Sequence, residues 1–124
     1  MSGTITQWRT GLRDALIAEF PDMPVYASPP NNPAAPCIIL RIAGGRQRTA
    51  NIWTQTLRAV IVGPGGDNEA TTQTFEDMLL RAAAVLSEET AQPVNWEEPG
   101  QTTLAGAPYL ATTLDVSFEV TPGG

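Results

Sequence analysis

Apolar residues recur at helical spacing in two segments of the chain. In residues 4–20 and 69–89 they lie three or four positions apart, as on one face of an amphipathic helix. These faces carry Ile5, Trp8, Leu12, Ala15, Leu16 and Phe20 in the first segment, and Phe75, Met78, Leu79, Ala82, Val85 and Leu86 in the second. Thr4 can cap the first helix, and Asp67 or Asn68 can cap the second, because their side-chain oxygens accept hydrogen bonds from free backbone N–H groups.

Other segments have the pattern of β-strands. Residues 108–120 alternate most regularly, so one face of this strand is predicted to meet the helices and the other solvent or another subunit. The inward row consists of Leu110, Thr112, Leu114, Val116, Phe118 and Val120. The predicted strands are 24–28, 37–43, 52–62, 93–99 and 108–120.

The order of these segments predicts an α+β fold in one domain, residues 1–124. We expect a mostly antiparallel sheet of four to five strands with two helices packed on one face. Proline occurs four times in residues 29–36, which predicts a stiff loop. Residues 44–51, "GGRQRTAN", are predicted to be the eight-residue loop of a hairpin, and residues 100–107 another loop.

Charge and composition narrow the possible functions. The formal net charge is −6, with thirteen acids, seven Arg and no Lys, so general binding to the phosphates of nucleic acid is disfavoured. The chain has no His and a single cysteine, Cys37, which disfavours a His- or Cys-based metal site and excludes an intramolecular disulfide. No apolar stretch is long enough to span a bilayer. We therefore expect no cofactor, no metal and no membrane partner, and a reducing cytoplasm as the place of synthesis.

Candidate catalytic groups are few. Glu97 and Glu98 lie beside Trp96, the combination of carboxylates and aromatic surface that a sugar-binding enzyme uses, although adjacent solvated acids have the same pattern. Cys37 begins an apolar strand and has no His to activate it, which favours an inert core thiol. Residues 63–68, "GPGGDN", lack the Lys and Ser/Thr of a phosphate-binding loop. No enzyme signature remains, and we expect none of the residues to be catalytic.

Arg46 and Arg48 are the two closest cations of the chain. They are either a solvated hairpin tip or a protein-contact loop whose guanidinium groups meet carboxylates of a neighbour. We take Arg46, Arg48, Asn51, Trp96, Glu97 and Glu98 as candidate interface residues.

The order of segments also carries a resemblance. A helix "ITQWRTGLRDALIAEF" and a short "PVYAS" are followed by the proline-rich approach "PPNNPAAPCIILRI" to the first long strand. A hairpin leads into "TLRAVIVGPGGDNEATTQTFEDMLLRAAAVL", and "APYLATTLDVSFEV" closes the domain. In this order the chain resembles the tail terminator (tail completion) proteins of long-tailed bacteriophages.

The resemblance implies a structural role in the virion. A terminator forms a ring, usually hexameric, that caps the head-proximal end of the tail tube, stops its polymerisation and offers a surface for joining the head. The implied partners are further copies of the chain, the tail tube protein and the head–neck connector or stopper protein. The implied location is the virion, after assembly in the host cytoplasm. DNA would pass through the lumen without specific binding, and Asp115 and Glu119 are candidate acids facing that channel.

Three alternatives stay open at this point. Another neck component, such as a head-closure or stopper protein, is also a small ring-forming α+β domain. A small sugar- or ligand-binding enzyme could use Glu97 and Glu98. An acidic inhibitor that mimics nucleic acid would bind a host protein and form no ring.

Overall fold

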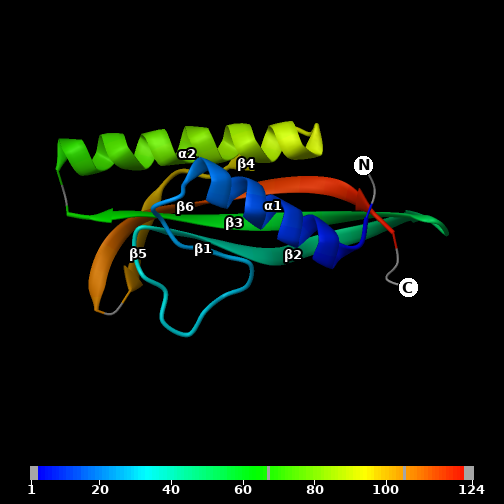
Figure 1. Ribbon diagram of the computed structural model, residues 1–124, viewed down its shortest axis with the longest axis horizontal. Helices are drawn as coiled ribbons and strands as arrows, with labels where there is room; N and C mark the ends of the chain where they lie inside the picture. The colour runs from blue at the N-terminus through cyan, green and yellow to red at the C-terminus, as the bar shows by residue number, and fades with distance from the viewer. Residues whose placement is uncertain (1–2, 67, 105, 122–124) are drawn as a thin grey trace.

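The computed structural model of the chain describes residues 3–66, 68–104 and 106–121. Two helices and six strands follow one another along these residues (Figure 1). They are α1 (Ile5–Glu19), β1 (Val25–Tyr26), β2 (Cys37–Thr49), β3 (Ile52–Gly65), α2 (Glu69–Thr90), β4 (Asn95–Trp96), β5 (Gly100–Leu104) and β6 (Ala107–Val120).

The strands form one sheet in the order β1-β2-β3-β6-β4, with β5 also paired to β6. All pairs are antiparallel except β1 with β2. The predicted α+β fold is confirmed, with six strands in place of four to five. The additional strand is β5, which occupies part of the predicted loop 100–107, of which residue 105 lies outside the described ranges. Its sequence, GQTTL, has no apolar alternation, because β5 is an edge strand that buries little.

Both helices begin where the sequence predicts. Thr4 and Gln7 form a capping box: the Gln7 N–H donates to Thr4 Oγ1 at 3.2 Å, and the Thr4 N–H donates to Gln7 Oε1 at 2.9 Å. At α2, Asn68 Oδ1 accepts from the Thr71 N–H at 2.9 Å, so Asn68 is the N-cap. The alternative cap, Asp67, lies outside the described residues.

The core lies between the two helices and one face of the sheet. Both helices contribute buried side chains to a single cluster with the inward rows of β2, β3 and β6, in which the predicted row of β6 from Thr112 to Val120 is buried. Trp8 stacks on Phe118 with ring centroids 4.6 Å apart, and its indole N–H donates to the Glu119 carbonyl at 3.0 Å. The helices are joined by Arg81, which bonds Glu19 at 2.9 Å and lies over the Phe20 ring.

The predicted loop 44–51 is wrong for most of its length. β2 continues to Thr49, so only Ala50 and Asn51 lie between the strands of the β2–β3 hairpin. The register shifts between Ile42 and Gly45, and again between Gln47 and Thr49. The two glycines at 44 and 45 therefore accommodate an irregularity inside the strand instead of ending it.

Candidate functional site

The end of the β2–β3 hairpin projects from the body of the molecule. Every residue from Gly44 to Ile52 is exposed, and we call this segment the arm. β6 ends beside Trp53, which pairs with Val120, so the last residues of the arm extend beyond the third strand. In Figure 1 the tip of the arm lies past both helices, at the right of the view.

The outer edge of the arm has no strand beside it. β1 pairs with β2 only at Ile38 and Ile39, and within the described ranges no other strand pairs with β2 on that side. From Leu40 to Thr49 the outward backbone N–H and C=O groups of β2 are thus open to pairing. Two register shifts and three arginines, at positions 41, 46 and 48, lie along this edge. Irregular backbone and charged side chains are features by which edge strands avoid unspecific pairing.

Arg46 and Arg48 have no carboxylate within 4.0 Å among the described residues. By contrast, Arg13, Arg58 and Arg81 each form an ion pair within the chain. The predicted interface residue Asn51 lies in the turn of the arm, where its backbone N–H donates to Thr49 Oγ1 at 3.3 Å. The structure therefore brings Arg46, Arg48 and Asn51 together on one exposed projection.

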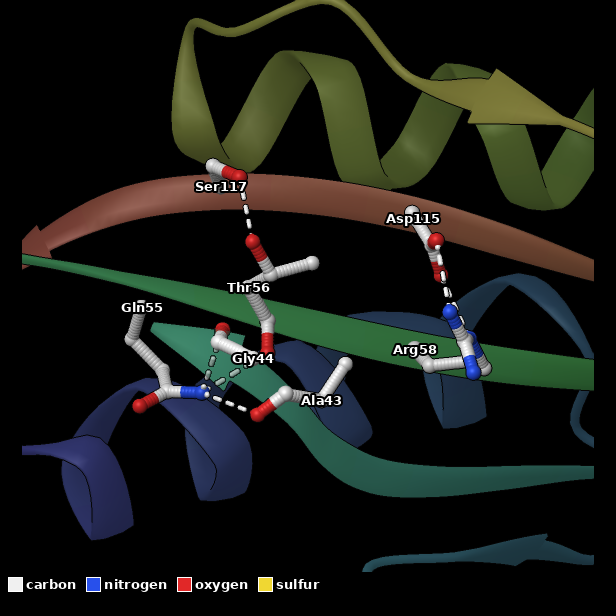
Figure 2. A network of polar contacts seen from close by, with 7 residues as sticks. All are labelled: Ala43, Gly44, Gln55, Thr56, Arg58, Asp115 and Ser117. Atoms are coloured by element: carbon white, nitrogen blue, oxygen red, sulfur yellow. Dashed lines mark hydrogen bonds and ion pairs between the residues drawn. The ribbon is translucent and has the colours of Figure 1, made fainter. Parts of the chain in front are cut away.

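Gln55 holds the base of the arm, a role that was not predicted from the sequence. Its side chain, 8 % exposed, donates from Nε2 to the carbonyls of Ala43 at 3.1 Å, Gly44 at 3.2 Å and Thr56 at 2.8 Å (Figure 2). Ala43 and Gly44 are the residues at the first register shift. A signal was present in the sequence, because Gln55 is the one amide in the inward row of β3 that continues with Leu57, Ala59 and Ile61.

A hollow of about 630 Å³ opens where the arm leaves the body. Ile5, Trp53 and Val120 provide apolar walls, and Arg46 and Gln47 lie at its border with the arm. An apolar depression with a cation at its border suits an aromatic or aliphatic side chain that is followed by a carboxylate.

The other candidate interface residues lie at the opposite edge of the sheet. Residues 95–98, Asn95 to Glu98, are all exposed and are called the acidic edge here. The Trp96 side chain is 47 % exposed. The predicted strand 93–99 is reduced to two residues, because the chain leaves the ladder at Glu97, whose carbonyl accepts from the buried Thr112 hydroxyl at 2.7 Å. Neither Glu97 nor Glu98 has an arginine within 4.0 Å in the described part of the chain.

Asp115 and Glu119, the candidate channel acids, differ in their surroundings. Arg58 forms a two-pronged ion pair with Asp115, at 2.9 Å and 3.1 Å, across β3 and β6 (Figure 2). The bond and charge of Asp115 raise the pKa of Arg58, and Glu97 adds a smaller effect in the same direction. The charge of Asp115 is therefore compensated within the chain, by a partner that was not predicted from the sequence. Glu119 is exposed and has no arginine within 4.0 Å among the described residues.

Beside this ion pair, Thr56 and Ser117 share a hydrogen bond of 2.7 Å between their hydroxyl groups (Figure 2). Both contacts lie on the face of the sheet that the helices leave uncovered, because Arg58 and Thr56 alternate with the buried Leu57. At these four positions of β3 and β6 the uncovered face is thus polar and internally paired.

No family model matches the sequence of this chain, and no curated protein is significantly similar to it. Across the described ranges, no group of three or more His, Cys, Asp or Glu side chains is arranged to hold a metal ion. Neither described helix is long and apolar enough to cross a membrane.

Proposed function

We propose that the protein is a structural component of a phage virion that assembles into a ring at the head-proximal end of the tail tube. The ring ends tube polymerisation and presents the surface on which the head is joined. The observation that carries this proposal is the arm, a projecting hairpin (Figure 1) in which every residue from Gly44 to Ile52 is exposed.

A two-stranded ribbon that is exposed on both faces gains little stability in water by itself. Ordering the ribbon that bears Arg46 and Arg48 therefore costs chain entropy. Neither arginine forms an ion pair within the described part of the chain. A contact with another subunit or with the tube end gives these residues a partner. Contacts between different patches of identical subunits are the kind that close into rings.

The charge of the chain supports the passage of DNA. A net charge of −6 per subunit makes a ring that repels phosphate, so DNA can slide through without being held. Of the two candidate channel acids, Asp115 is paired with Arg58. Glu119 is therefore the one that is available to face a channel.

The test is to remove the protein from the phage and to locate it in intact particles. Without a terminator, tail tubes should have irregular lengths and should remain unattached to heads in electron micrographs. A tagged copy should appear at the head-proximal end of the tail by cryo-imaging. Tails of normal length that join heads without this protein would refute the proposal.

A further inference from the structure

Basic and acidic residues are concentrated in different segments of the sequence. Residues 23–66 contain four arginines and no acid, namely Arg41, Arg46, Arg48 and Arg58. Residues 82–124 contain six acids and no arginine or lysine, namely Glu88, Glu89, Glu97, Glu98, Asp115 and Glu119.

The fold converts this separation into a sheet with two unlike halves. β1, β2 and β3 come from the basic segment and lie side by side, whereas β6, β4 and β5 come from the acidic segment and form the other half. The halves meet where β3 pairs with β6, and there Arg58 bonds Asp115. A contact between the basic half and the acidic half thus already exists inside one subunit.

The two halves of the sheet also carry charged residues that do not take part in this internal contact. The arm belongs to β2 and β3, and the acidic edge follows β6 in the sheet, so the width of the sheet separates them. Arg46 and Arg48 belong to the arm, where Arg48 lines a hollow with Glu119 but forms no ion pair with it. Glu97 and Glu98, at the acidic edge, also have no ion-pair partner among the residues described. Within the described ranges, unpaired charges of opposite sign therefore lie on the two halves of one sheet, with Arg41, Arg46 and Arg48 on β2 and with Glu97 and Glu98 just after β4.

The two patches also match in their apolar surfaces, an exposed aromatic side chain on one and an apolar hollow beside the other. Trp96 is the exposed aromatic at the acidic edge, next to the two carboxylates. The hollow at the base of the arm has apolar walls from Ile5, Trp53 and Val120 and lies next to Arg46. An aromatic anchor in an apolar depression, surrounded by charged contacts, is the usual composition of a strong interface centre.

We propose that the acidic edge of one copy binds the arm of a second copy. Trp96 occupies the hollow, and Glu97 and Glu98 pair with Arg46 and Arg48. This inference deepens the proposed function, and it relies on that function only for the closure of the contact into a ring. Because the two patches are different, a pair of copies keeps one free arm and one free acidic edge, and the contact can repeat from subunit to subunit.

Charge-exchanged variants test the contact directly. The R46E/R48E variant carries carboxylates on both patches, and the E97R/E98R variant carries guanidinium groups on both, so neither should self-associate. An equimolar mixture of the two restores opposite charges at every contact. We expect the mixture to form complexes with equal numbers of both variants, measured by native mass spectrometry with one variant isotopically labelled.

Sedimentation up to about 1 mM protein, the weak end of specific binding, provides the affinities. Each variant alone should raise the apparent dissociation constant of self-association at least about tenfold relative to the unaltered chain. The W96A variant should do the same without a change of charge. The matched control is E88R/E89R, which reverses an equally exposed pair of adjacent acids at the end of α2 and should leave self-association unchanged.

The outcomes separate the inference from the proposed function. An unaltered chain that stays monomeric throughout this range overturns the contact, and so does a mixture that associates no better than its components. In either case the proposed function is still decided by the phage experiment. A closed dimer that obeys the charge exchange supports the contact and contradicts the ring.

Discussion

At the scale of single residues, Cys37 is buried at the start of β2, next to Ile38 of the core cluster. Its side chain is fully buried, and burial raises the pKa of the thiol from 9.0 to about 11, because the apolar surroundings penalise the thiolate. A shift of this size leaves about a hundredfold less thiolate at pH 8 than an exposed cysteine has. We expect the folded protein to react with a thiol reagent at pH 8 at least that much more slowly than the protein in urea.

The same shift has a consequence for stability. Since the pKa of Cys37 is higher in the folded chain than in the unfolded chain, its contribution is fully present below pH 9.0 and is lost as the pH rises towards 11. Urea unfolding midpoints of the unaltered protein should therefore fall more steeply over this range than those of the C37A variant. Parallel slopes would contradict the assigned shift.

Gln55 provides the second prediction at this scale. Replacing it by Met keeps the length of the side chain but leaves the carbonyls of Ala43 and Gly44 without their donor. We expect a loss of about 1 kcal/mol in the free energy of unfolding, measured in urea, because the carbonyl acceptors lose their part-buried hydrogen bonds.

Amide hydrogen exchange should also become faster in residues 43–49, since the donor holds the base of the arm. The matched control is Q101M, which changes an exposed glutamine on β5 and should shift stability by less than about 0.5 kcal/mol. Unchanged exchange in the arm of Q55M would show that the arm is held by other contacts.

At the scale of elements, Gly63 marks a close approach between β3 and α2. A Cβ atom at this position would lie 2.8 Å from Phe75 Cδ1 and 3.2 Å from Phe75 Cβ, which forces the two elements apart. We expect G63A to lower the free energy of unfolding by about 1–3 kcal/mol, because this part of the core is fully packed.

The control is Gly11, because its surroundings are open whereas those of Gly63 are crowded. Gly11 is exposed on α1, and a Cβ there would meet nothing within 4 Å. G11A should raise the free energy of unfolding by about 0.5–1 kcal/mol, because alanine loses less entropy in a helix than glycine does. Equal effects of the two changes in thermal unfolding would contradict the packing described at Gly63.

The sequence predicts the elements well where burial sets their pattern. Both helices and the inward row of β6 were predicted because apolar side chains must meet the core at a regular spacing. The arm and β5 were not predicted as strands, since their side chains are largely exposed and their composition reflects no core. Backbone pairing with β3 and β6 holds them, and such pairing leaves little trace in the side-chain pattern.

The candidate site follows the same division. The exposed positions of Arg46, Arg48 and Trp96 were predictable from a hairpin tip and a short strand between prolines. The partner of Asp115 was not, because Arg58 lies far away in sequence and the register of β3 on β6 brings them together. The role of Gln55 depends on the register shift between Ile42 and Gly45, and the spacing of residues in a sequence does not predict such a shift.

At the scale of the whole molecule, the arm is separable from the fold. No residue from Gly44 to Ile52 belongs to the core cluster, which is formed by the helices and the inner parts of β2, β3 and β6. The contacts that determine folding are thus made without the arm, and the arm is left free for another partner. Stability and assembly should therefore respond to different changes.

A shortened hairpin tests this separation. Gln47 and Trp53 face each other in the ladder, so residues 48–52 can be replaced by Asn-Gly, a two-residue turn that suits the twist of antiparallel strands. The free energy of unfolding should change by less than about 0.5 kcal/mol, because only exposed side chains are removed. Self-association should weaken at least about tenfold in sedimentation, because Arg48 and the tip are lost. A shortened chain that unfolds several kcal/mol more easily would make the tip part of the folding unit, whereas one that associates normally would move the subunit contact elsewhere on the molecule.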